Sequence, residues 1–392
     1  MNVRLRVCAH CALGATALLL VLNWTAPRAA AWGSTGHSHI TGGAIPHLPQ
    51  PLRSFFEANV STIRSQASQE PPGRHYIDID VYPEFAAGTF PHDVNVLIAK
   101  YGASYVEQNG RGPWTYADYV QSLTTLMSNA RTKQDWLNLI PTAAAQAHYI
   151  EDMHNPLHLT QNYDGQLSGN NGVHSRYESS MISRKLSNLT FSAADAEFQA
   201  TVIDDVFDSI DIHYQFVDDI MAADTAARAA AGSYNTAYYD SMWSQTGDFT
   251  RVLFQEASEA VADGWYTAWV NAGSPIPNLG LTGDYNGDNV IDAGDYTAWR
   301  DAVGVSPNPL VNDPTPATVD ESDFTYWKEH FGQSIGGFSA ATAVPEPAAV
   351  SLLFAAAIAG SAVRRRRFSF RARLSPRSCL HPGTHRSRPR AL

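Results

Sequence analysis

The stretch HYIEDMHNPLH, from His148 to His158, decides how this chain folds around its most reactive side chains. His148 and Asp152 are four residues apart, so on an α-helix they lie on the same face. Pro156 ends such a helix, and the chain beyond it can return His158 toward the same point. Imidazole nitrogens and carboxylate oxygens are ligands that zinc accepts readily. The stretch therefore predicts a helix whose end holds a metal site.

Two more segments repeat this combination of side chains. His174 and Glu178 are again four residues apart, and the segment HYID from His75 to Asp78 places a further imidazole beside a carboxylate. A single His–Glu pair at this spacing is typical of a solvated helix surface. Several such groups in one chain are better explained by a site that holds more than one zinc ion.

The residues from 32 to 275 have the spacing of helices, and few segments alternate at the strand period. Tyr116–Ala130 places apolar side chains three or four residues apart. Pro141 stands where a helix begins, before an alanine-rich run. The ranges Thr201–Ala231 and Phe249–Val270 contain few helix breakers. We expect a mainly α fold with one multi-helix domain over residues 32–275.

The first 31 residues are typical of a secretory signal peptide, with a positively charged start, an apolar run and three alanines that end at Ala31. Cleavage after Ala31 would free the α-amine of Trp32. That amine and the Trp32 carbonyl can chelate a metal ion together with His37. The simpler interpretation is that Trp32 is an ordinary N-terminal aromatic residue.

The charge of the chain is distributed unevenly. Residues 364–392 contain ten arginines, residues 1–31 contain three, and neither range contains an acidic residue. The whole chain has a net charge of −11, so residues 32–363 carry about −24. The composition of residues 32–363 therefore shows no basic groove for nucleic acid. A phosphate substrate would have to be attracted by bound metal cations. All three cysteines lie in the two basic ends, so the exported body is expected to have no disulfide.

These motifs together resemble the zinc-dependent phospholipase C and P1-type single-strand nuclease superfamily. The resemblance covers residues 32–275 and implies an all-α domain that holds three zinc ions. It implies one ion bound by His75, His148 and Asp152, a second by His158, His174 and Glu178, and a third by the amine and carbonyl of Trp32 with His37, where Asp152 bridges the first and third. It also implies that Tyr76 and Asp78 contact a nucleobase, although Tyr76 can equally be a packed core residue.

The chain departs from this family in one position. The family has an aspartate a dozen or more residues before the position of His75, where it binds the first zinc and orients the attacking water. Residues 59–73 contain no aspartate, and the nearest carboxylate is that of Glu70. Either Glu70 substitutes with its longer side chain, or it is a solvated loop residue and the first zinc lacks a ligand.

The resemblance implies an exported zinc-dependent phosphodiester hydrolase in which metal-activated water attacks phosphorus, with Asp152 and Glu70 as catalytic residues. The short spacing between Trp32 and His37 favours an endonuclease that acts on single-stranded nucleic acid. Glu178, with a tyrosine instead of a tryptophan before it, favours a phospholipase C. The missing aspartate supports a third reading, a non-catalytic envelope-binding module in which metal ions only staple the fold.

Residues 276–335 follow a linker rich in proline and glycine and contain a calcium-loop pattern. The pattern resembles the dockerin variant of the EF-hand loop, and a second copy at residues 318–328 is expected to be degenerate. Such a module implies a cohesin-like partner, or it acts as a calcium-stapled spacer. Oxygen ligands recur at the spacing that suits Ca²⁺, from Asp284, Asn286, Asp288, the carbonyl of Val290, Asp292 and Asp295.

Residues 336–392 consist of a linker, a Pro-Glu-Pro motif, the apolar run Ala348–Val363 and a basic tail. This order resembles the PEP-CTERM sorting signal, which implies exosortase-type machinery and a location in the cell envelope or outside the cell. Such signals usually end soon after their arginines, whereas here 25 residues follow Arg367. A plain membrane anchor is the alternative, although the run is shorter than the roughly 20 residues that a spanning helix needs.

Overall fold

A computed structural model describes residues 32–71, 73–315 and 318–335 of the protein. Within these ranges the chain is helical, and the only β pairing is an isolated bridge between Val290 and Ser334. The expected mainly α fold is confirmed. The α-helices are α1 (Gly33–Ala44), α2 (Leu52–Ala58), α3 (Val60–Ala67), α4 (Pro83–Ala86), α5 (Val94–Tyr101), α6 (Ala103–Gln108), α7 (Gly112–Asn129), α8 (Lys133–Asn138), α9 (Ile140–Met153), α10 (Ile182–Lys185), α11 (Val202–His213), α12 (Val217–Ala231), α13 (Thr236–Asn271), α14 (Ala293–Ala302) and α15 (Glu321–His330).

Shorter helical turns connect several of these elements. They are the 3₁₀ turns η1 (Ile45–His47), η2 (Ile79–Val81), η3 (Pro156–His158), η5 (Leu186–Asn188) and η6 (Tyr214–Phe216), and the π-helix η4 (Ser175–Met181). The helices expected from sequence are present as α7, α9 and the pair α11 and α12, which η6 joins. The last expected helix lies inside α13, which is longer at its N-terminal end because Asn235 caps it there through the amide of Tyr238.

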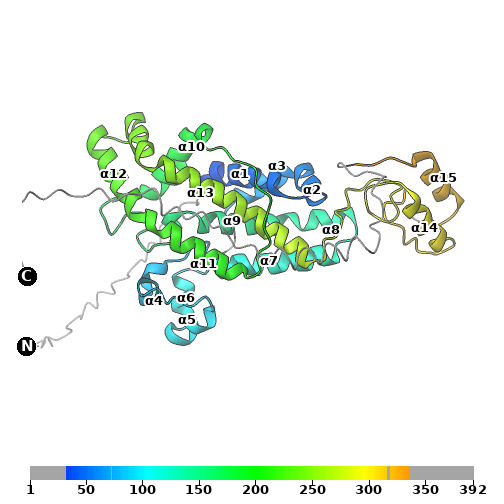
Figure 1. Ribbon diagram of the computed structural model, residues 1–392, viewed down its shortest axis with the longest axis horizontal. Coiled ribbons are helices and arrows are strands. Elements are labelled where there is room, and N and C mark those ends of the chain that lie inside the picture. The colour runs from blue at the N-terminus through cyan, green and yellow to red at the C-terminus, as the bar shows by residue number, and fades with distance from the viewer. Residues whose placement is uncertain (1–31, 72, 316–317, 336–392) are drawn as a thin grey trace, which may run out of the picture. The chain divides into compact units, whose positions relative to one another are not determined.

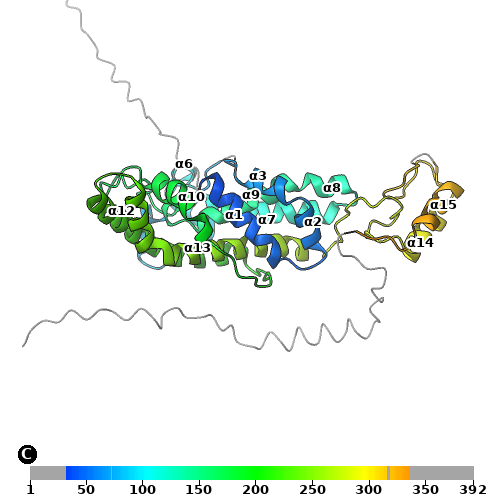
Figure 2. The same ribbon diagram turned by 90° about the horizontal axis from the view of Figure 1, so that it is seen from above.

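Helix α9 lies at the centre of the helical domain, beside α1, α7 and α13 (Figures 1 and 2). Pro141 occupies its first turn, where a missing amide hydrogen costs nothing. From Ala143 onward nearly every side chain is buried, which is the pattern of a helix covered on all sides. Its small alanines let the neighbouring helices approach closely. Polar side chains at its C-terminal end are therefore surrounded by protein.

Helix α13 spans 36 residues and packs against α7 and α9. Gly264 lies at their closest approach, because a Cβ there would overlap the side chains of Gln146 and Tyr116. The next residue, Trp265, is fully buried and donates from Nε1 to the carbonyl of Ala143 at 3.0 Å. Replacing such a buried indole with alanine typically costs about 3–5 kcal/mol in folding free energy. These contacts lock the helix that carries His148 and Asp152 into the core.

The carboxyl of Asp263 on the same helix predicts a pH dependence of stability. Burial and neighbouring carboxylates raise its pKa from 3.8 to about 7, against a hydrogen bond from the Glu197 amide. The folded state therefore binds a proton that the unfolded state loses, so this group's contribution to stability is present below pH 3.8 and is lost as pH rises through 7. We expect Asp263→Asn to raise the melting temperature at pH 8 by roughly 3–6 °C. The gain should vanish at pH 4, and equal gains at both pH values would contradict the assignment.

The described part of residues 276–335 contains α14 and α15. Each helix begins with a capping box, built on Asp292 or Asp320. The indole of Trp299 donates to the carbonyl of Asp320 at 2.8 Å, and the indole of Trp327 donates to the carbonyl of Asp292 at 2.7 Å. The two copies of the sequence repeat therefore hold the start of each other's helix.

Two sequence predictions lie outside the described residues. These are the signal peptide of residues 1–31 and the PEP-CTERM-like tail that follows residue 335. Within the described part of the chain, no helix combines the length and the apolar character that crossing a bilayer requires.

Candidate metal centre

Segments that lie far apart in the sequence bring the candidate ligands to one buried place. Helix α1 contributes His37, the segment before η2 contributes His75, and the C-terminal end of α9 contributes His148 and Asp152. The turn η3 adds His158, and the start of the π-helix adds His174 and Glu178.

The turn after α9 returns the chain to the centre as expected. Pro156 keeps Asn155 in an extended conformation, and the Asn155 side chain caps η3 by accepting from the Leu157 amide at 3.1 Å. Backbone hydrogen bonds then hold the segment that contains His75 against this turn. They run from the amides of Ile77 and Ile79 to the carbonyls of His158 and Leu159, at 2.9 and 3.2 Å.

The π-helix that carries Glu178 is fixed by a buried ion pair. The guanidinium of Arg176 donates to the carboxylate of Asp224 on α12 at 2.9 and 3.0 Å, and both side chains are buried. Asn155 donates to Oε2 of Glu178 at 3.1 Å and orients that carboxylate. Such π-helical turns are rare and are frequent at functional sites.

The ligand atoms form four overlapping groups, each with its nitrogen and oxygen atoms within 4.8 Å of one another. Every member except Glu70 is buried. All seven side chains predicted as zinc ligands belong to these groups. The groups are His37–His148–Asp152, Glu70–His75–His148, His75–Asp152–His158 and His158–His174–Glu178.

The hydrogen bonds of two imidazoles show which way their lone pairs point. Nδ1 of His148 lies 2.7 Å from the carbonyl of Ala67, and Nδ1 of His158 lies 3.2 Å from the carbonyl of His75. A carbonyl only accepts, so both Nδ1 atoms donate and the neutral rings present Nε2 lone pairs. Nε2 of His148 faces Oδ2 of Asp152 at 3.2 Å, and Nε2 of His158 faces Oε2 of Glu178 at 3.6 Å. The His148–Asp152 pair sets one acceptor against another, an arrangement that a cation between them would stabilise.

Further acceptors in this centre have no donor. Nε2 of His37 lies 3.4 Å from Oδ1 of Asp152, and both atoms are buried without a hydrogen-bond partner in the described part of the chain. The same holds for Nε2 of His148 and Oε1 of Glu178. Leaving a buried acceptor unsatisfied costs about 1–3 kcal/mol each. These nitrogen and oxygen atoms therefore fit the role of ligands to bound metal ions.

The electrostatics of the centre follow from burial and from proximity. Burial lowers the pKa of His37 well below its usual value, and burial also dominates the lowered pKa of His158. Burial opposes the ionisation of Asp152, but the neighbouring imidazoles outweigh it and hold its pKa well below the usual value. Burial raises the pKa of Glu178 to about 8. A metal ion would replace the protons that partly balance these charges now.

Glu70 lies on the exposed side of the centre. Its Oε2 is 3.1 Å from Nε2 of His75, and about half of its side chain is exposed. The hydrogen bond to His75 lowers the pKa of Glu70. Burial lowers the pKa of His75, but Asp152 and Glu70 outweigh it and raise that pKa to about 10. The structure brings Glu70 to the ligands, as the substitution hypothesis requires, and its zinc role stays a prediction.

Sequence reasoning missed one residue of the centre, Glu151. It precedes Asp152 and is fully buried, and its carboxylate contacts Nδ1 of His37 and the hydroxyl of Thr41. Burial raises its pKa well above the usual value. The sequence does offer one signal for Glu151, which is a second acidic residue in a helix whose pattern leaves no exposed face. Its partners on α1 are more than one hundred residues away and carry no spacing relation to it.

The N-terminal ligand and the base-binding residues have definite places. Trp32 is fully buried against Phe254 and Tyr177, and its carbonyl accepts from the Gly36 amide at 3.0 Å. The zinc role of its amine stays a prediction, since in the uncleaved chain this nitrogen belongs to a peptide bond. Tyr76 and Asp78 are buried, and neither belongs to the four ligand groups.

The calcium loop keeps its acidic residues close to its own backbone. Oxygens of Asp284 accept from the amides of Gly287, Asp288 and Asn289, and oxygens of Asp295 accept from those of Tyr285, Asn286 and Asp292. Burial raises the pKa of Asp284 to about 6 and that of Asp295 to about 7. Within the described ranges, these carboxylates do not form a group as tight as the four above. The calcium ligands, Asp288 and the Val290 carbonyl included, therefore stay predictions.

Five further histidines of the helical domain lie outside the four groups. Rings of His39, His47 and His154 bond to backbone carbonyls. Nδ1 of His92 bonds to Asp204 at 2.7 Å, and Nε2 of His213 bonds to Glu256 at 2.8 Å. Among the described residues, no serine hydroxyl bonds to either of these two histidine–carboxylate pairs.

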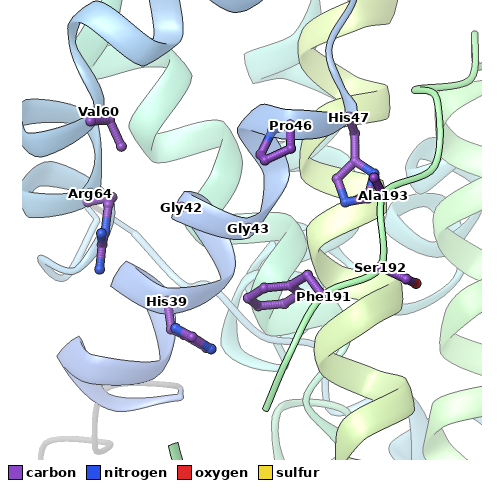
Figure 3. Close-up of a pocket in the computed structure, with 10 residues that line it drawn as sticks. All are labelled: His39, Gly42, Gly43, Pro46, His47, Val60, Arg64, Phe191, Ser192 and Ala193. Carbon is purple, nitrogen blue, oxygen red and sulfur yellow. The ribbon is translucent and has the colours of Figure 1, made fainter. Parts of the chain in front are cut away.

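A cavity of about 400 Å³ lies between α1, α3 and the segment around Phe191. Figure 3 shows the side chains of Arg64, His39 and His47 around it, over Gly42 and Gly43 of α1. None of its lining residues belongs to the four ligand groups. The cavity and the candidate metal centre are therefore separate sites, although α1 contributes residues to both.

No protein-family model matches the chain. A protein of Bradyrhizobium tropiciagri that is named a probable serine protease is 25% identical to the chain over 218 residues. The match covers 47% of this chain and 26% of the relative, so the chain spans about a quarter of the length of the curated relative it matches. The comparison points to an enzyme.

This finding contradicts the function predicted from sequence. The relative is named as a protease, and neither a nuclease, nor a phospholipase C, nor a non-catalytic binding module agrees with that name. The nucleobase role of Tyr76 and Asp78 falls with the nuclease prediction. The physical reason for the error is that metal ligands do not encode the bond to be cleaved, because the same Lewis acid polarises carbonyl and phosphoryl oxygens.

Proposed function

We propose that the helical domain is a metal-dependent hydrolase whose centre holds divalent ions, with zinc as the preferred metal. The observation that carries the proposal is the set of buried acceptor atoms that face one another without donors, around Asp152 and Glu178. Imidazole and carboxylate ligands in closed, buried groups suit Zn²⁺ better than Ca²⁺ or Mg²⁺, which prefer oxygen. The ligand set also supports the resemblance to the zinc-dependent superfamily at the level of the centre.

The residues of the centre have different roles in this proposal. Asp152 belongs to the groups of both His37 and His75, and these side chains would hold metal ions, while His158, His174 and Glu178 would hold another. When bound, zinc supplies a Lewis acid and a water that loses its proton near neutral pH. Glu70, half exposed beside His75, would accept a hydrogen bond from the attacking water and orient it. His148 and His158 keep their Nε2 lone pairs turned inward because backbone carbonyl groups fix Nδ1.

The name of the relative favours a peptide bond as the substrate. A scissile carbonyl is polarised by a Lewis acid as well as a phosphoryl group is, so a protease is compatible with this centre. The nucleophile would be water, because the two histidine–carboxylate pairs outside the ligand groups, His92–Asp204 and His213–Glu256, have no serine hydroxyl among their hydrogen-bond partners in the described part of the chain.

The test is peptide hydrolysis by the zinc-loaded chain, assayed with casein and fluorogenic peptides. We expect turnover that 1,10-phenanthroline abolishes and that added zinc restores, while a serine-directed fluorophosphonate has no effect. Inhibition by the fluorophosphonate alone would overturn the metal-dependent mechanism. Single-stranded DNA and phosphatidylcholine serve as control substrates, and their cleavage in place of peptides would reverse the choice of bond.

A further inference from the structure

Glu151 and Asp152 are neighbours on α9, and both are fully buried. Successive residues of a helix point in directions about 100° apart, so the two carboxylates serve different partners. Asp152 faces the imidazoles of the centre, whereas Glu151 faces α1. A buried carboxylate away from water is costly unless its oxygens are bonded, and both Glu151 oxygens have partners.

The side-chain partners of Glu151 lie on α1, and its carbonyl has a partner in Trp32, which precedes α1. The Thr41 hydroxyl donates to Oε1 at 2.7 Å, and Nδ1 of His37 contacts Oε2. His37 and Thr41 are four residues apart and share one face of α1. The backbone carbonyl of Glu151 accepts from the indole Nε1 of Trp32 at 2.8 Å. One residue of α9 therefore contacts both Trp32, which precedes α1, and the imidazole of His37.

These contacts decide how the His37 ring is used. Oε2 of Glu151 meets Nδ1, so the opposite nitrogen, Nε2, is the one turned toward Oδ1 of Asp152, at 3.4 Å. The ring is also stacked on His148, with centroids 3.8 Å apart. The rings of His148 and His158 are oriented by backbone carbonyls. His37 instead rests on a carboxylate, which raises the basicity of the opposite nitrogen more than a carbonyl does.

We propose that Glu151 is a positioning residue that sets the affinity for the ion shared by His37 and Asp152. It fixes the ring orientation and tautomer of His37 without touching the ion. The group His158–His174–Glu178 has no contact with it and keeps its affinity. The inference rests on the proposed function, because it concerns the metal centre of that enzyme.

The test measures zinc bound to the full chain as the free zinc concentration is set by a metal buffer. We expect Glu151→Gln to weaken one zinc site about 10- to 100-fold, the range typical of losing an outer partner of a metal-ligating histidine, and to leave the tighter sites unchanged. Thr41→Val should weaken the same site less, because only one oxygen of Glu151 loses its donor.

Glu256→Gln is the matched control, since Glu256 also accepts from a histidine ring but lies outside the centre. It should leave every zinc affinity unchanged. If Glu151→Gln proves unstable, nitrogen NMR of the zinc-free wild type tests the same point by the tautomer of His37. A proton on Nε2 instead of Nδ1 would overturn the inference.

The two proposals fail in different ways. Wild-type protein that binds no zinc removes the proposed function and this inference with it. Wild-type protein that binds zinc, together with Glu151→Gln protein of equal affinity at every site, overturns only the role of Glu151.

Discussion

Replacing Asp152 with asparagine is expected to remove at least one metal ion and to lower hydrolytic turnover on the order of 10³-fold, beyond the 10- to 100-fold typical of losing an outer-shell partner. Oδ1 of Asp152 faces Nε2 of His37, and Oδ2 lies 2.6 Å from His75 and 3.2 Å from His148. The carboxylate thus belongs to two ligand groups at once. Asparagine keeps the shape but loses the charge and one of the two bridging oxygens.

The measurement is zinc content by mass spectrometry beside the initial rate of peptide hydrolysis. Asp204→Asn is the control, because Asp204 also pairs with a histidine, His92, but on the exposed surface away from the ligand groups. It should keep both zinc and rate. An Asp152→Asn protein with full zinc content and a wild-type rate would contradict the bridging role.

Removal of the metal is expected to lower the melting temperature of the helical domain by roughly 10 °C. A ligand at a thousand times its dissociation constant stabilises the folded state by about 4 kcal/mol, which corresponds to about 8–16 °C in a domain of this size. The apo centre leaves acceptors such as Nε2 of His37 and Oδ1 of Asp152 buried without donors. Each of these unpaired acceptors favours unfolded or partly open states, in which water can donate a hydrogen bond to it.

Differential scanning calorimetry with and without a chelator tests this expectation. A strong zinc chelator should produce the full shift, and readdition of zinc should reverse it. A calcium-selective chelator should leave the melting temperature of the helical domain unchanged. The same experiment would reveal any separate effect of calcium on residues 276–335. Identical melting curves in all conditions would mean that the buried groups are satisfied by other means.

Part of the candidate centre was predictable from local spacing, while His37 and His75 were assigned through the family resemblance. His148 and Asp152 share a face on any helix, Pro156 must end that helix, and His174 and Glu178 repeat the four-residue step. Glu151 was not predictable, because its role depends on which helix packs against the other face of α9. The π-helical form of the segment around Glu178 also has no signal in the sequence.

The bond that the centre cleaves was not predictable either. A resemblance carried by metal ligands favoured phosphodiesters, and the comparison with a protein named a probable serine protease contradicts that choice. Ligand spacing reports what holds the ions, while substrate choice depends on side chains around them that follow no common spacing.

The sequence by itself determined the helical class, the helices around His148 and Tyr116, and the candidate ligand pairs His148–Asp152 and His174–Glu178, since each depends on periodicity or on residues within one turn of helix. Only the tertiary structure decided that α1 delivers His37 to Asp152, that Glu70 reaches His75, and that Glu151 clamps α1 to α9. These contacts join residues with no regular spacing along the chain, and most of them are separated by long stretches of sequence. Their geometry is fixed by the packing of α1, α7 and α13 around α9, and packing has no period that a sequence displays.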